Sequence, residues 1–374
     1  MTKTLEKVLR KPLTGILISV VIGFLIGTVI LLVAGFNPGS AYAAMFRGIF
    51  SKPKYISQVI INATPLILTA LSVSFAAKTG LFNIGAEGQY IMGTLAAALI
   101  GYYVQLPPVI HPIFILLCAM LFGGLWGALA GWLKTKFGIH EVISTIMLNW
   151  IALYLNNYIL SLPGVKKQGA QASNEILTSA RTSILWDWKR SDAGKAWVAE
   201  HPVLGDILKT DLHWGILIAL VAAVVIWFFL KHTTKGYAMR AVGQNPNASR
   251  FAGINVNRNT VQAMFIAGAL AALGGAVQIM GTNSFRISVL PSHEGYGWDG
   301  LSVSLLAGSN PLGCILSALM FAALKYGSST MQGDVGAPSE IINIMIGVIV
   351  LCIALSSIYP MIADSLKRRE EMHA

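Results

Sequence analysis

The amino-acid sequence predicts an all-α polytopic membrane protein. Of its 374 residues, 55% are hydrophobic and only 11% are charged, whereas soluble proteins carry about 25% charged residues. The mean hydropathy is +0.65, and the apolar residues gather in runs of about 20, the length of a membrane-spanning helix. Because lipid offers the backbone no hydrogen-bond partners, such runs are expected to be helical.

The net charge of +11 could indicate a nucleic-acid partner or a membrane topology. The Lys and Arg residues lie at the ends of the apolar runs, so the enrichment of basic residues in cytoplasmic loops explains them better. The three cysteines lie in apolar runs, at no spacing typical of a disulfide or a metal site: Cys118, Cys314 and Cys352. We expect them to be packing residues, and we expect no nucleic-acid partner.

The apolar runs give the expected helices. The first run is too long for a signal-peptide core and lacks a small-residue cleavage site, so it is interpreted as a retained span. An external amphipathic segment is expected around residues 41–50. In chain order the expected helices cover residues 15–36, 56–77, 83–103, 113–133, 141–160, 214–230, 260–281, 298–307, 312–326 and 341–359.

The charged ends of the chain predict its topology. Basic residues in segments 1–14 and 360–374 place both termini in the cytoplasm, on either side of a transmembrane domain over residues 15–359. Counting 298–326 as one crossing would leave the C-terminus outside. This stretch is therefore expected to be a re-entrant pair or two short spans, giving roughly eight to ten transmembrane helices.

Two long polar segments differ in charge. Residues 163–212 contain seven Lys/Arg and six Asp/Glu, a balance that fits an external loop. Residues 231–258 contain five Lys/Arg and no acidic residue, so this loop is expected to be cytoplasmic. Glycine, asparagine and proline divide the second loop into short helical pieces. We interpret it as a docking surface through which a cytosolic partner acts on the membrane domain; the alternative is a solvated connector.

Two of the expected helices are interrupted by short breaks. The first break contains Gly80 and Gly85, and the second contains Gly308, Asn310 and Pro311. Asn83 and Asn310 are the expected N-caps, with Pro311 in the first helical position. The motif Leu-Ser-Val-Ser precedes both breaks, at residues 71–74 and 301–304. Paired broken helices are typical of the central site of a transporter.

Polar residues near the first break are the candidates for a solute route. Glu87 is the acidic residue most clearly at membrane depth, and ionisable groups there are functional candidates. The alternative is that Glu87 stabilises the start of its own helix and Asn83 only caps it. The predicted route residues are Asn83, Glu87, Gln89, Asn149 and Trp150.

The sequence carries no catalytic signature. It contains no G-x-x-x-x-G-K-[ST] motif for ATP, no G-x-S-x-G motif and no histidine spacing typical of a metal site. We therefore expect no catalytic residue, no metal and no enzymatic activity in this chain.

Four segments resemble a known family. Residues 79–89, TGLFNIGAEGQ, resemble the glycine-rich signature of the permease subunits of ABC importers in the branched-chain amino acid and simple-sugar group. Residues 140–151, HEVISTIMLNWI, are similar to the version in its purine-nucleoside permeases, the branch linked to basic membrane proteins. Residues 236–254 resemble the family's cytoplasmic coupling loop, and residues 306–313, LAGSNPLG, a later block. Nothing in residues 163–212 matches.

The resemblance implies a pore subunit of the cytoplasmic membrane that imports nucleosides. Its implied partners are a second, homologous permease in a heterodimer, a cytosolic ATPase that holds ATP and Mg²⁺, and an extracytoplasmic binding lipoprotein. The chain itself would hold no cofactor. By analogy, the coupling helix that contacts the ATPase is shaped by Gly243, Asn245, Pro246, Ala248, Arg250 and Gly253.

Three alternatives stay open. The same machinery could import ribose-like sugars or branched-chain amino acids. An ion-driven secondary transporter would need paired carboxylates in the membrane, and Glu87 is nearly alone. A membrane enzyme is disfavoured by the missing motifs.

Overall fold

The computed structural model describes residues 12–282 and 284–355, together with residues 358 and 364. The expected termini 1–11 and 365–374 lie outside the described residues, as does most of 356–363. Within the described part the chain forms α-helices joined by loops, with three isolated β-bridges and no strand. The helices are α2 (Pro12–Val33), α3 (Pro38–Phe50), α4 (Pro53–Lys78), α5 (Ala86–Tyr103), α6 (Ile110–Phe137), α7 (Glu141–Ser161), α8 (Asp192–Glu200), α9 (Pro202–Leu208), α10 (Gly215–His232), α11 (Thr234–Gln244), α12 (Pro246–Phe251), α13 (Val256–Gly281), α14 (Tyr296–Leu306), α15 (Gly313–Val335) and α16 (Ser339–Ala354).

The all-α prediction is confirmed. Six of the described helices are long and apolar enough to cross a membrane, namely α4, α6, α7, α10, α13 and α15. Both predicted breaks are present, between α4 and α5 and between α14 and α15. The main difference is the end of α15, which was expected near Tyr326 and lies at Val335. The polar residues that ended the apolar run are accommodated in the helix, where the hydroxyls of Ser328 and Ser329 donate hydrogen bonds to carbonyls of the preceding turn.

The chain divides into two compact units, residues 1–51 with 323–374 and residues 52–322. In the first unit α2 packs against α16, where Gly23 lies against the backbone of Ile349. The expected amphipathic segment is α3, which buries Ala44 and Met45 and exposes Phe50.

The second unit is built around α13. This helix packs against α4, α5 and α6 and is buried along most of its length. Small residues allow this approach: a Cβ added to Gly268 of α13 would collide with the carbonyl oxygen of Gly123 on α6, and one added to Gly275 would collide with that of Tyr90 on α5. Such contacts between backbones are typical of membrane helix interfaces.

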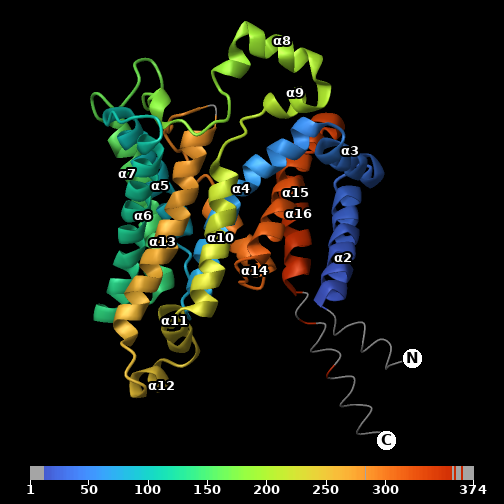
Figure 1. Cartoon of the computed structure of the whole chain (residues 1–374). Helices are drawn as coiled ribbons and strands as arrows, with labels where there is room; N and C mark the ends of the chain where they lie inside the picture. Colours follow the sequence, from blue (N-terminus) through green and yellow to red (C-terminus); the bar gives the residue numbers. More distant parts are fainter. Residues whose placement is uncertain (1–11, 283, 356–357, 359–363, 365–374) are drawn as a thin grey trace, which may run out of the picture. The chain divides into compact units, whose positions relative to one another are not determined.

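The two polar segments lie at opposite ends of the second unit. Figure 1 shows α11 and α12, from the basic loop, at one end and α8 and α9, from residues 163–212, at the other. We therefore refer to these as the cytoplasmic and external ends, following the charge of the two loops.

Candidate functional site

The first helix break contains a closed hydrogen-bond network. Asn83 and Gln89 exchange two amide hydrogen bonds of 2.8 and 3.1 Å, and Asn83 also donates to the hydroxyl of Ser72 at 3.0 Å. All three side chains are buried, with at most 1% of their surface exposed. The network fixes the path of the chain through the break.

Asn83 does not cap α5 in the predicted way. Its Oδ1 accepts from the backbone N–H of Gly85 at 3.1 Å, and the helix begins only at Ala86. The prediction of a helix starting directly after Asn83 was wrong because the side chain closes a turn before the helix. The second break behaves similarly: Asn310 accepts from the N–H of Leu312 at 3.1 Å, and α15 begins at Gly313, so Pro311 precedes the helix.

Glu87 joins the first break to the start of α14. Its two carboxylate oxygens accept from the backbone N–H groups of Gly295 and Gly297 at 2.8 and 2.6 Å. These N–H groups belong to the N-terminus of α14, where an anion is favoured by unpaired donors and by the helix dipole. Glu87 therefore stabilises the start of a different helix from its own.

The other two predicted route residues lie on α7. Asn149 accepts from the N–H of Gly88 at 2.8 Å and donates to the carbonyl of Ile84 at 3.0 Å, so it also holds the first break. Trp150 is 46% exposed and packs edge-on against His293, with 4.7 Å between ring centroids. The structure thus brings all five predicted residues around one break and onto the segment that leads into α14.

Next to this cluster, on its external side, lies a polar cavity of about 160 Å³. We call it the polar cavity; its lining includes Tyr90 of α5, Asn156 of α7, Gln278 of α13 and Tyr296 of α14. The rings of the two tyrosines stack with 5.0 Å between centroids. The exposed Glu294 also lines it, so the cavity reaches solvent there.

Two buried acceptor oxygens of this lining have no hydrogen-bond partner in the described part of the chain. They are Oδ1 of Asn156 and Oε1 of Gln278. Since buried polar groups in proteins are nearly always paired, unpaired atoms that converge on one cavity indicate bound water or a bound polar molecule. Of these lining residues only Asn156 stands out in the sequence, as a polar residue in an expected span, because the others come from separate helices.

The external loop covers the polar cavity. Segment 284–290 forms one wall, and residues 171–176 bond to it through the backbone: Ser173 N–H donates to Ile287 O, Ile176 N–H to Phe285 O, and Val289 N–H to Gln171 O, at 2.8 to 2.9 Å. We call these two segments together the roof. The loop that the sequence left without a structure therefore has an ordered path over the cavity.

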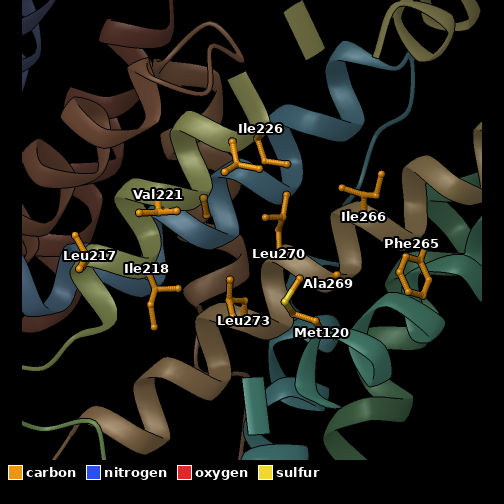
Figure 2. Close-up of a pocket in the computed structure, with 12 residues that line it drawn as sticks. Met120, Leu217, Ile218, Val221, Ile226, Phe265, Ile266, Ala269, Leu270 and Leu273 are labelled. Carbon is orange, nitrogen blue, oxygen red and sulfur yellow. The ribbon is translucent and has the colours of Figure 1, made fainter. Parts of the chain in front are cut away.

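A further cavity lies elsewhere and is apolar. It has a volume of about 480 Å³ and is lined by aliphatic and aromatic side chains of α6, α10 and α13, among them Met120, Val221 and Leu270 (Figure 2). Without polar groups it cannot orient a polar solute.

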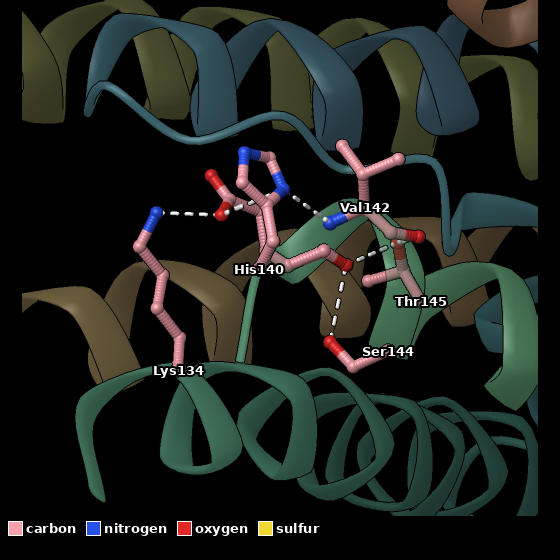
Figure 3. A network of polar contacts seen from close by, with 6 residues as sticks. Lys134, His140, Val142, Ser144 and Thr145 are labelled. Atoms are coloured by element: carbon pink, nitrogen blue, oxygen red, sulfur yellow. Dashed lines mark hydrogen bonds and ion pairs between the residues drawn. The ribbon is translucent and has the colours of Figure 1, made fainter. Parts of the chain in front are cut away.

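A network of polar contacts joins α6 to α7 at the cytoplasmic end (Figure 3). Lys134 donates to the buried carboxylate of Glu141 at 2.6 Å, and Thr145 donates to the carbonyl of Glu141 at 2.7 Å. Thr145 lies against Gly85, where an added Cβ would be 3.0 Å from the Cβ of Thr145. The network therefore anchors the start of α7 beside the first break.

The predicted coupling residues form two short helices and the turns beside them. Asn245 ends α11 and caps α12, its Oδ1 accepting from the N–H groups of Asn247 and Ala248. Pro246 is in the first turn of α12, and Gly253 follows the helix with φ of +78°. Ala248 and Arg250 are exposed, and Phe251, which is not among the predicted coupling residues, is 96% exposed.

Gly243 connects this loop to the first break. A Cβ added to Gly243 would lie 2.5 Å from the carbonyl carbon of Thr79, and one added to Gly80 would lie 2.5 Å from the Cα of Gly243. Gly80 also has φ of +75°, a conformation that favours glycine. The basic loop and the first break thus touch backbone to backbone.

Comparisons with known proteins agree with this architecture. The family model described as branched-chain amino acid transport system / permease component matches residues 55–354. The guanosine ABC transporter permease protein NupP of Bacillus subtilis is 38% identical, with 94% of this chain and 96% of the relative covered.

Two further relatives widen the range of named solutes. The nucleoside ABC transporter permease protein NupB of Lactococcus lactis is 33% identical, covering 94% of this chain and 93% of the relative. The glucose ABC transporter permease protein TsgB13 of Haloferax volcanii is 30% identical, covering 91% and 87%. No solved structure gives a significant match.

Proposed function

The chain belongs to the family of permease components of branched-chain amino acid transport systems, and within this family we propose that it imports nucleosides. It is the permease of an ABC transporter and a multi-pass protein of the cytoplasmic membrane. In this proposal ATP and Mg²⁺ bind to a separate ATPase subunit, and the solute passes through the permease without chemical change.

The polar cavity supports a nucleoside as the solute. A nucleoside has a flat base that can stack on an aromatic ring and several groups that donate or accept hydrogen bonds. The cavity offers the stacked rings of Tyr90 and Tyr296 together with unpaired acceptors on Asn156 and Gln278. The names of two relatives, guanosine and nucleoside permeases, point the same way.

A test of this site uses Gln278→Met, which keeps the length of the side chain and removes its polar atoms. We expect uptake of radiolabelled guanosine to show a KM about tenfold higher, since a lost hydrogen bond to a bound polar group is worth about 1–2 kcal/mol. Asn257→Leu, at an exposed position on the same helix and outside the polar cavity, is the control. Equal KM values for the two variants would exclude the cavity as a solute site.

A sugar is the second candidate solute, because one relative is named a glucose permease. Unlabelled guanosine, ribose and glucose would be compared as competitors in the same uptake assay. If glucose or ribose inhibits uptake at a lower concentration than unlabelled guanosine does, the solute is a sugar and the nucleoside proposal is wrong. An ion-driven mechanism has little support, because both carboxylate oxygens of Glu87 are used by backbone N–H groups.

We place the ATPase contact on α12. Its support is the exposure of Arg250 and Phe251 on a short, capped helix at the cytoplasmic end. Replacing Asn245 and Arg250 together by alanine removes the cap, worth about 0.5–2 kcal/mol, and a surface cation. We expect the purified transporter to lose solute-stimulated ATPase activity.

A matched control for this variant is Asn255→Ala. Asn255 caps α13, accepting from the N–H of Arg258 at 2.9 Å. Because α13 is held by packing along its length, loss of that cap should leave ATPase stimulation within about twofold of the wild type. If solute still stimulates ATPase activity in the variant lacking Asn245 and Arg250, α12 is not part of the contact with the ATPase.

The remaining partners and the solute route extend the proposal. A second, homologous permease would complete the pore, and an extracytoplasmic lipoprotein would deliver solute to the roof side of the polar cavity. Asn83, Glu87, Gln89, Asn149 and Trp150 stay candidates for the route below the cavity, where Glu87 and Trp150 contact the segment leading into α14.

A further inference from the structure

A second polar pocket lies at the cytoplasmic end of the unit formed by residues 52–322. It has a volume of about 250 Å³ and is lined by three cations, Lys78, Lys231 and Arg240, with Trp227 and Asn310 beside them. No acidic residue is in the lining. The pocket is separate from the polar cavity and from the exposed face of α12.

Helix-end electrostatics explain two of the three cations. Lys78 is in the last turn of α4 and Lys231 in the last turn of α10, where cations interact favourably with helix C-termini. Lys231 also lies over the ring of Trp227, 5.2 Å from its centroid. Neither contact neutralises the positive charge.

The position of Arg240 is not explained by a helix C-terminus. It lies within α11, is partly buried, and its Nε is buried without a hydrogen-bond partner in the described chain. Among the described residues, the structure shows no ion pair for Arg240, Lys78 or Lys231. An unpaired, buried guanidinium nitrogen in a pocket that two ammonium groups also line favours an anion as the bound group.

We propose that this pocket binds the phosphate group of an anionic phospholipid of the inner leaflet. Guanidinium and ammonium groups are the usual ligands of phosphate, and tryptophan is enriched at the depth of lipid headgroups. Asn310 can add a donor, because its oxygen is the atom used at Leu312. The negative potential of the cytoplasmic leaflet concentrates such lipids at this end of the protein.

The pocket joins the parts that transmit work to the membrane domain. Its lining comes from the end of α4, the end of α10, α11 and the second helix break. A bound headgroup would hold the start of the coupling loop against both breaks. This inference concerns lipid regulation and does not depend on the identity of the solute.

The test is lipid binding to the purified, delipidated transporter complex, measured by native mass spectrometry. Phosphatidylglycerol, phosphatidylcholine and inorganic phosphate are added separately to the wild type, to Lys231→Gln/Arg240→Gln and to Lys136→Gln. Lys136 is an exposed cation at the cytoplasmic end of α6, outside the pocket, and controls for net charge.

We expect the wild type and Lys136→Gln to bind phosphatidylglycerol equally and phosphatidylcholine weakly. Each pocket cation contributes about fivefold in affinity, so the double variant should bind about 25-fold more weakly. Lys231→Gln alone, at an exposed position, should lose about fivefold and keeps the test valid if the double variant does not fold. The proposal is overturned if Lys231→Gln binds phosphatidylglycerol as tightly as the wild type does. It is also overturned if the wild type binds phosphatidylcholine as tightly as phosphatidylglycerol. If inorganic phosphate binds as tightly as phosphatidylglycerol, the site belongs to a soluble anion and the lipid is excluded.

Discussion

Replacing Gly243 with alanine is expected to uncouple ATP hydrolysis from uptake in a chain that still inserts into the membrane. The added Cβ would lie 2.5 Å from the carbonyl carbon of Thr79 and 2.6 Å from the nitrogen of Gly80. Neither neighbour is a flexible side chain, so the coupling loop must move away from the first break. Overpacking of this kind costs about 1–3 kcal/mol.

The measurement compares guanosine uptake and solute-stimulated ATPase activity with the amount of permease in the membrane. We expect uptake to fall about 5- to 150-fold, the range that corresponds to this cost, with the amount of protein unchanged. Gly347→Ala is the matched control, because nothing lies within 4 Å of its added Cβ. Normal uptake in Gly243→Ala would show that the backbone contact with Thr79 and Gly80 does not transmit work.

Replacing Glu87 with glutamine is expected to destabilise the fold before it affects solute recognition. The carboxylate accepts from two backbone N–H groups, those of Gly295 and Gly297. A glutamine has one acceptor oxygen, and its NH₂ group would face the second N–H. Leaving a buried donor unpaired costs about 1–3 kcal/mol.

Thermal unfolding of the detergent-solubilised protein checks this expectation. The midpoint for Glu87→Gln should be clearly lower than that of the wild type, whereas Glu200→Gln, at an exposed position in α8, should match it. An unchanged midpoint together with altered uptake would instead assign Glu87 to the solute route and make its contact with α14 secondary.

The sequence predicted the long helices well because apolar runs of bilayer length have one physical solution, a helix whose backbone is paired internally. It also located both breaks, since glycine, asparagine and proline interrupt helices for local reasons. It placed the helix starts less accurately. The side chain of Asn83 has several possible partners, and only the folded chain shows that Gln89 and Ser72 take its amide.

The polar cavity could not be predicted from the sequence. Tyr90, Asn156, Gln278 and Tyr296 lie on four different helices, and each alone resembles an ordinary interfacial or buried polar residue. Their importance comes from convergence, which depends on how α5, α7, α13 and α14 pack. Glu87 was identified for its depth in the membrane, but its partners lie on a segment far along the chain.

The roof is attached mainly by backbone hydrogen bonds, from Ser173, Ile176 and Val289. Every residue except proline has a backbone donor, and every residue has an acceptor. Most substitutions in residues 171–176 therefore leave these bonds intact. The path of the loop can persist while its side chains diverge, which accounts for a segment that has a defined structure and no recognisable motif. Side chains on the outer surface of residues 171–176 can therefore change without altering the cavity beneath them.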